Sequence, residues 1–230
     1  MSTQSHVGIA ASAPADARTA FIRQTYLHLA GAVLAFIAIE TVLVRLPSAD
    51  DLSRTMTGGY AWLAVLGLFF FVSSIADRWA RSSTSVGMQY LGLALFVFAQ
   101  AIVMLPILYG AVNYSSDDVI PTAAILTGLL FLGLTIVAFT SGADFSFLRS
   151  ALTIGSLLSI GLIVASIVFG FSLGLIFAAG LVVLASGSIL YQTSNIIRTY
   201  RTNQHVAAAL GLFSSVALLF WNVLRLVQRR

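Results

Sequence analysis

The sequence predicts an all-α polytopic membrane protein, and three observations lead to this fold class. Of the 230 residues, 59% are hydrophobic and only 9% are charged, whereas a soluble domain carries about 25% charged residues. The mean hydropathy is +0.97. Apolar runs of about 20 residues, the length that crosses a bilayer, follow one another along most of the chain. Because a globule of this size cannot hide so much apolar surface from water, a lipid bilayer is the predicted environment.

Seven of these runs predict a bundle of seven transmembrane helices. Residues 1–25 are polar and rich in Ala and Ser, and they are predicted to form a disordered tail ahead of a transmembrane domain at 26–230. A short Gly/Ser turn separates the fifth and sixth runs. The predicted spans are about Tyr26 to Leu46, Tyr60 to Ala76, Val86 to Tyr109, Val119 to Thr140, Ala151 to Phe169, the turn at Gly174 to Tyr191, and Val206 to Val227.

The distribution of Arg predicts the orientation of the bundle, since short cytoplasmic segments carry an excess of positive charge. With the N-terminus in the cytoplasm, the inner flanks hold Arg18, Arg23, Arg78, Arg81, Arg149, Arg198 and Arg201. The outer flanks then hold Arg45, Arg54, Arg229 and Arg230. This excess favours a cytoplasmic N-terminus. The Arg pair at the C-terminus argues the other way, and leaves a re-entrant last segment open.

Missing residue types exclude several functions. The chain has no Cys, which excludes disulfides, thiolate metal sites and Cys nucleophiles. All 12 basic residues are Arg, so the chain has no Lys. Schiff-base chemistry and a Walker-type phosphate loop are excluded, because each needs a Lys amine. The net charge of +4 does not indicate nucleic-acid binding, because the placement of Arg in a membrane protein reports its orientation. No nucleic-acid partner is therefore expected. We see no Ser–His pair or Asp pair within the spans, so no catalytic residue and no enzyme activity are predicted.

Glu40 is the only Glu in the chain, and it lies inside the first predicted span. A carboxylate that faces lipid at depth costs several kcal/mol, so Glu40 is expected to face the bundle or a wet cavity. It is the candidate cation or proton site. The alternative is a side chain near the outer interface that reaches water, or one that pairs with Arg45 or Arg54.

Polar side chains predict a seam between the last two spans. Gln192 and Asn195 are three residues apart and share a helix face. Ser215 and Asn222 are seven apart and also share a face. Such a seam is either hydrogen-bonded packing between the helices or the lining of a pathway.

The histidines do not predict a metal site. His6, His28 and His205 are scattered along the chain, and none has a carboxylate at ligand spacing. We therefore expect no metal site and no cofactor, and interfacial hydrogen bonding is the expected role of each His.

Four segments resemble the Bax inhibitor (transmembrane Bax inhibitor motif) family, and specifically its bacterial YccA-like branch. The segment at 185–198, with Tyr-Gln-Thr-Ser-Asn at its centre, is the most specific. The resemblance covers nearly the whole chain after residue 20. The four segments are 21–29, 138–148, 185–198 and 209–226.

This resemblance implies a seven-helix bundle with the last helix at its centre. Family members are described as calcium-leak channels whose pH gating is attributed to a carboxylate pair on the sixth and seventh helices. Those two positions fall on Gln192 and Ser215 here, and neither side chain titrates in the range of a carboxylate. Calcium transport with altered or absent pH gating is therefore the alternative function.

The YccA-like branch is associated with the membrane AAA protease FtsH, as substrate and modulator, engaged through a cytoplasmic N-terminal tail. The resemblance thus implies an inner-membrane modulator of FtsH in membrane-protein quality control. Its expected partners are the lipid bilayer, FtsH and, for the alternative function, calcium ions.

Overall fold

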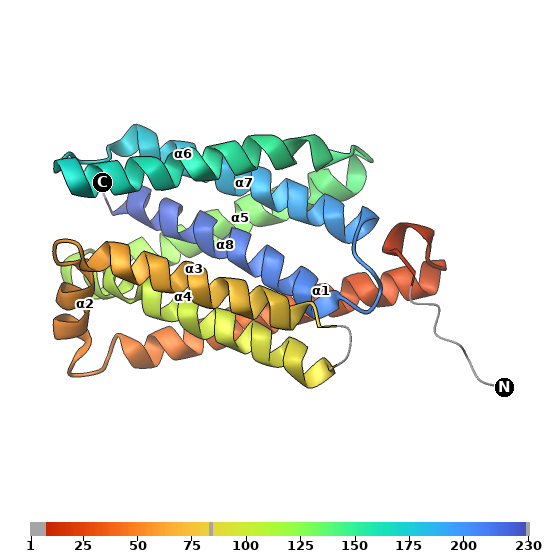
Figure 1. The fold of residues 1–230 in the computed structure, drawn as a ribbon, viewed down its shortest axis with the longest axis horizontal. Coiled ribbons are helices and arrows are strands. Elements are labelled where there is room, and N and C mark those ends of the chain that lie inside the picture. The colour runs from red at the N-terminus through yellow and green to blue at the C-terminus, as the bar shows by residue number, and fades with distance from the viewer. Residues whose placement is uncertain (1–7, 83–84, 229–230) are drawn as a thin grey trace.

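The computed structural model describes residues 8–82 and 85–228, and this part of the chain is almost entirely helical (Figure 1). Within it, seven helices are long and apolar enough to cross a membrane. The elements in chain order are η1 (Ala10–Ser12), α1 (Ala15–Leu43), α2 (Ala49–Thr57), α3 (Ala61–Ala80), α4 (Val86–Tyr114), α5 (Val119–Thr140), η2 (Phe145–Phe147), α6 (Leu148–Phe169), α7 (Leu175–Arg198) and α8 (His205–Val227).

The first helix starts well before the predicted span. Helix α1 begins at Ala15, whereas the sequence predicted a disordered tail as far as residue 25. The added turns contain three Ala, two Arg and one Gln, residue types that favour helix even where no membrane surrounds them. Pro14 precedes the helix as its N-cap residue, and Pro is tolerated at a helix start because it lacks only a backbone donor that has no helical partner there. Residues 1–7 of the predicted tail lie outside the described residues.

Helix α2 was not predicted, because nine residues that include two Asp and an Arg are too short and too polar to span. Its Ala49, Ser53 and Met56 are buried, and a spacing of four and three residues places them on one face. On the exposed side Arg54 pairs with Asp50 at 2.9 Å. The short helix packs against α3 and α4.

The last helix contacts most of the others. Helix α8 packs against α1, α3, α4, α5 and α7, whereas α6 packs mainly against α7. The most apolar window of α8 is 67% buried, against none of the corresponding window of α6. Ala207, Ala208 and Ala209 are fully buried, and such small residues let neighbouring helices approach closely in lipid.

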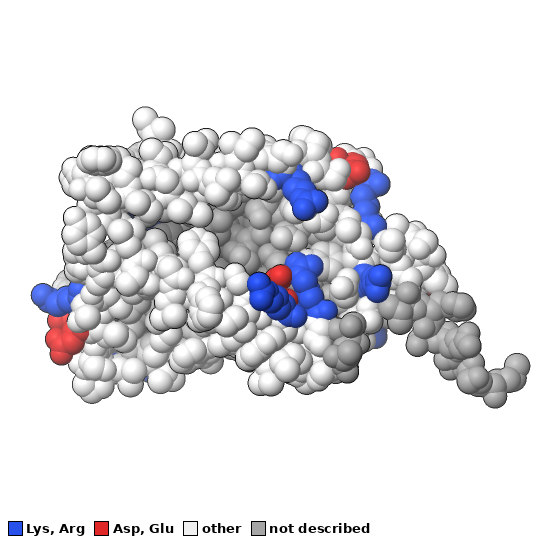
Figure 2. Space-filling model, in the orientation of Figure 1, with Lys and Arg blue, Asp and Glu red and all other residues white. Residues whose placement is uncertain are grey.

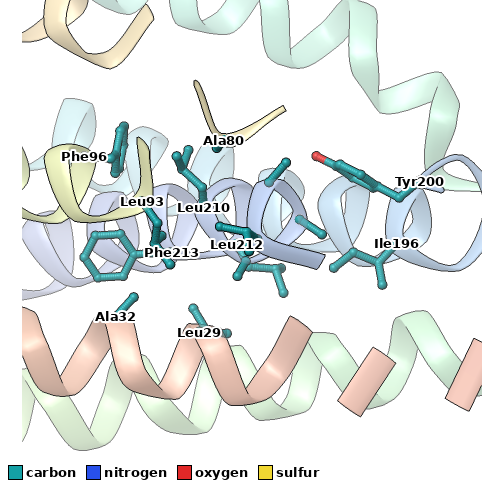
Figure 3. Close-up of a cluster of buried hydrophobic side chains, with 14 of the residues drawn as sticks. Leu29, Ala32, Ala80, Leu93, Phe96, Ile196, Tyr200, Leu210, Leu212 and Phe213 are labelled. Atoms are coloured by element: carbon teal, nitrogen blue, oxygen red, sulfur yellow. The ribbon is translucent and has the colours of Figure 1, made fainter. Parts of the chain in front are cut away.

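Two apolar clusters fill the bundle, and α8 belongs to both. The first cluster joins the N-terminal half of α8 to α1, α3, α4 and the end of α7 (Figure 3). In it, Leu29 and Ala32 of α1 point toward Leu212 and Phe213 of α8. The second cluster joins the C-terminal half of α8 to α4, α5 and α7. We call the end where α1, α4 and α8 begin the N-terminal end of the bundle.

The surface matches a membrane-embedded bundle. Charged side chains gather toward the two ends and leave an uncharged band between them on the face shown in Figure 2. The same face is hollowed between α3 and the α6–α7 pair, where α8 lies deeper. Large apolar side chains near the middle of α3, such as Leu68 and Phe71, are 64% exposed, as expected when lipid is the solvent.

Candidate functional site

The two positions implied for the carboxylate pair lie on facing helices, but they do not bond to each other. Gln192 of α7 lies against Gly211 of α8, where an added Cβ would stand 3.0 Å from the Gln192 Oε1 atom. Glycine at 211 therefore leaves the space that the Gln192 amide occupies. Ser215 lies one turn further along α8.

The hydrogen-bond partner of Ser215 is Ser188, which the sequence did not single out. The two Oγ atoms are 2.8 Å apart, and Ser215 Oγ donates to the carbonyl of Gly211 at 3.1 Å. Because Ser215 has one hydroxyl hydrogen, it accepts from Ser188. Ser188 precedes Gln192 by four residues, so the two share a face of α7. This four-residue spacing was the sequence signal that could have drawn attention to Ser188.

Asn195 and Asn222 do not extend this contact into a continuous seam. The pairs 188–215 and 192–211 show that α7 and α8 run antiparallel. Asn195 therefore lies near the N-terminal end of the bundle and Asn222 in the opposite half, about 20 Å apart along the axis. Asn222 is fully buried and donates to Leu218 O at 2.8 Å. Its Oδ1 has no partner among the described residues.

Glu40 is buried inside the bundle. Its side chain is 6% exposed, and neither carboxyl oxygen has a hydrogen-bond partner in the described part of the chain. Phe36 and Val44, one turn before and one turn after, both pack against the second apolar cluster. Arg54 pairs with Asp50 instead. The sequence left two environments open for Glu40, the inside of the bundle and the outer interface. These contacts agree with the first.

Two of the four segments that carry the family resemblance, 138–148 and 185–198, meet at the N-terminal end of the bundle. The backbone N–H of Phe145, in the segment at 138–148, donates to Ser194 Oγ at 3.3 Å. Arg198 Nη2 donates to the carbonyl of Gly142 at 2.6 Å. The loop before α6 is thereby fastened to the end of α7.

The N-terminal segment is fastened to the loop between α7 and α8. Ile9 and Arg201 form an isolated antiparallel bridge. The N–H of Ala10 donates to Tyr200 O at 2.9 Å, and the N–H of Thr202 donates to Gly8 O at 3.2 Å. Ala10 and Tyr200 belong to the first apolar cluster. The predicted tail thus includes a segment that packs on the bundle.

Two of the three histidines come together, which the sequence did not predict. His28 of α1 and His205 of α8 have ring centres 4.8 Å apart, and His28 Nε2 lies 2.9 Å from the Tyr90 hydroxyl of α4. No three His, Cys, Asp or Glu side chains gather as a metal site within the described residues.

Together these features describe a polytopic helical membrane protein. Its last two helices meet through an amide and two hydroxyl groups. Elsewhere in the bundle, the Glu40 carboxyl group is buried without a hydrogen-bond partner among the described residues. Such a contact can hold helices together or line a polar path, but it carries no pair of titrating groups.

The chain belongs to the Bax inhibitor family: the family described as inhibitor of apoptosis-promoting Bax1 matches residues 18–230. An uncharacterized protein of Pseudomonas aeruginosa is 30% identical over 209 residues, covering 89% of this chain and 87% of its own. The modulator of FtsH protease YccA of Escherichia coli K12 is 29% identical over 209 residues, covering 90% and 88%. Protein LIFEGUARD 4 of Arabidopsis thaliana is 29% identical over 222 residues, covering 93% and 86%.

Proposed function

We propose that this protein resides in the bacterial inner membrane with its N-terminus in the cytoplasm and modulates a membrane AAA protease of the FtsH class, of which it is also a substrate. The E. coli relative named as a modulator of FtsH covers 90% of the chain. The excess of Arg on the flanks at the N-terminal end supports the orientation.

The observation that carries the proposal is the contact between residues 8–10 and the loop at 200–202. Residues 1–7 precede this contact, and it fastens the chain to the bundle just after them. A protease that pulls on the N-terminus meets this contact first. Its strength therefore sets how easily the protein is extracted, and hence whether it occupies the protease or is degraded by it.

Turnover in cells tests this proposal. Deleting residues 2–7 removes the segment before the contact and is expected to lengthen the half-life of the protein without changing its fold. Ala10→Asp places a charge at a fully buried position, loosens the contact and is expected to shorten the half-life. Ala11→Asp is the matched control, because Ala11 is exposed.

The same variants are then followed in cells depleted of the protease. The differences in half-life are expected to disappear there. Equal half-lives for the wild type, the deletion and Ala10→Asp in protease-containing cells would exclude engagement through this segment.

A second candidate function is a cation leak. The observation that favours it is the buried Glu40 carboxyl group, which has no hydrogen-bond partner in the part of the chain that the structure describes. Calcium flux into liposomes, measured at several pH values, tests it, with Glu40→Gln as the variant that removes the acid and keeps the shape. Flux no greater than in empty liposomes would exclude this function.

The positions of the carboxylate pair are tested in the same assay. Gln192→Asp combined with Ser215→Asp places two acids on facing helices, where like charges share a proton. We expect the double variant to acquire pH-dependent flux. A pH profile identical to that of the wild type would show that these positions do not control a path.

A further inference from the structure

Three aromatic side chains from three helices meet at the N-terminal end of the bundle. His28 comes from α1, Tyr90 from α4 and His205 from α8. His28 Nε2 lies 2.9 Å from Tyr90 Oη, and the two imidazole ring centres are 4.8 Å apart with an angle of 52° between the rings. None of these groups takes part in the contact between α7 and α8 or in the proposed role of residues 8–10.

The surroundings of His28 fix which of its ring nitrogens carries the hydrogen and which carries a lone pair. His28 Nδ1 lies 2.7 Å from the backbone carbonyl oxygen of Gln24. A carbonyl only accepts, so Nδ1 carries the hydrogen and donates. In the neutral ring, Nε2 then has a free lone pair, which accepts from the Tyr90 hydroxyl. A histidine that donates through one nitrogen to a carbonyl and offers the other is arranged like a metal ligand with its outer hydrogen bond in place.

His205 supplies the second ring. Its Nδ1 is buried and has no hydrogen-bond partner among the described residues, which is costly for a polar atom. A metal–imidazole nitrogen bond measures about 2.0–2.1 Å, so two imidazoles on one ion at near-tetrahedral angles have ring centres about 5 Å apart. The observed 4.8 Å agrees with that separation.

Tyr90 and solvent complete the arrangement. The Tyr90 hydroxyl donates to His28 Nε2, the nitrogen whose lone pair an ion would take in its place. Tyr90 is 44% exposed, so an ion and water can enter from that side. Two of the charged groups at the end of α3, Asp77 and the C-cap residue Arg81, pair with each other at 2.8 Å. With two His ligands and no carboxylate, the site suits an ion that prefers neutral imidazole.

We propose that His28 and His205, with Tyr90 beside them, form a binding site for one divalent transition-metal ion of the class that imidazole prefers: Zn²⁺, Cu²⁺ or Ni²⁺. Water fills the remaining coordination positions. The bound ion connects the middle of α1 to the beginnings of α4 and α8, which are far apart in the sequence. It stabilises the folded state, because it binds the assembled helices and not the separate ones.

Binding to the purified, full-length protein without a polyhistidine tag tests the proposal. Titration with Zn²⁺ is expected to show one saturable site per chain, and the midpoint of thermal unfolding is expected to rise with Zn²⁺. Cu²⁺ is expected to give an electron paramagnetic resonance spectrum with two coupled nitrogens. His28→Asn and His205→Gln keep polar side chains at both positions, and each is expected to weaken Zn²⁺ binding at least tenfold and leave one coupled nitrogen.

His6→Asn is the control, since it removes the chain's third His and leaves both His28 and His205 in place. It is expected to bind Zn²⁺ as the wild type does. The proposal is overturned if the wild type shows no saturable Zn²⁺ site. It is equally overturned if His28→Asn and His205→Gln, with helicity unchanged by circular dichroism, bind Zn²⁺ as tightly as the wild type.

Discussion

Ser188 Oγ of α7 lies 2.8 Å from Ser215 Oγ of α8, at one of the two positions where the family resemblance implies a carboxylate. The bond connects the most buried span of the bundle to its antiparallel neighbour. A hydroxyl pair keeps the same hydrogen bond over the whole physiological pH range, because neither group titrates there. The contact between these helices is therefore expected to be insensitive to pH.

Removing either hydroxyl is expected to weaken the bundle modestly. Hydrogen bonds between membrane helices contribute about 0.6 kcal/mol on average and up to about 1.7. Ser188→Ala and Ser215→Ala should each lower the free energy of unfolding by an amount in this range. The double variant should cost less than the sum, because both single changes remove one shared bond. Unfolding in mixed micelles measures this. Ser214→Ala is the control, and additive effects of the two main changes would contradict the shared bond.

Close packing between α3 and α4 depends on Gly92. A Cβ at this position would stand 2.5 Å from the backbone atoms Ala76 O and Ala80 N, which cannot withdraw as a flexible side chain can. Gly92→Ala is expected to destabilise the protein by about 1–3 kcal/mol, as overpacking does. Gly110→Ala is the matched control on the same helix, since a Cβ there meets no atom within 4 Å. Equal thermal stability of the two variants would show that the helices separate without cost.

Burial of the Glu40 carboxyl group, which has no hydrogen-bond partner within residues 8–82 and 85–228, is expected to cost stability. An unsatisfied buried polar group costs about 1–3 kcal/mol. Glu40→Leu keeps a side chain of similar size and should therefore raise the midpoint of thermal unfolding. Asp51→Leu is the control, because Asp51 is exposed on α2. A lower midpoint for Glu40→Leu would mean that the carboxyl group has a stabilising partner, such as a bound ion.

Acid is expected to loosen the turn before α6. Asp144 Oδ1 accepts from the N–H of Ser146 at 2.9 Å, and this bond to the charged form holds the pKa of Asp144 below its usual value. Because the pKa is lowered, the stabilisation that this hydrogen bond gives the turn is fully present above the ordinary pKa range of Asp. It is lost as the pH falls through the lowered value. Amide hydrogen exchange at Ser146, corrected for intrinsic rates, should show protection at pH 6 that declines at pH 3.

In the Asp144→Ala variant, the protection of the Ser146 amide should be reduced at both pH values. Protection at pH 3 equal to that at pH 6 in the wild type would contradict the assignment.

The sequence predicts the spans well because hydropathy acts locally. The predicted span from Val119 to Thr140 matches α5 at both ends, where acidic and small polar residues flank an apolar run. The polar beginning of α1 was missed, since a helix that extends beyond the bilayer carries no apolar signal. Helix α2 was missed because one buried face of nine residues is too weak a pattern to separate from a loop.

The site was harder to predict, because its contacts join distant parts of the chain. Gln192 and Ser215 follow from the resemblance. Ser188 lies four residues before Gln192, but Ser is common in these spans, so this spacing alone does not identify it as the partner of Ser215. Helical spacing predicts that Asn195 shares a face with Gln192 and that Asn222 shares a face with Ser215. It does not show that antiparallel packing puts Asn195 and Asn222 in opposite halves of the bundle. His28 and His205 meet only through the packing of α1 on α8.

The proposed modulator role is tested most directly by reconstitution. The purified protein and an FtsH-class protease are placed in one bilayer with a second membrane substrate, and degradation of that substrate is followed. We expect degradation to slow as this protein is added, and to slow much less when residues 2–7 are deleted. A rate of degradation unchanged by an excess of the wild-type protein would contradict the proposed function.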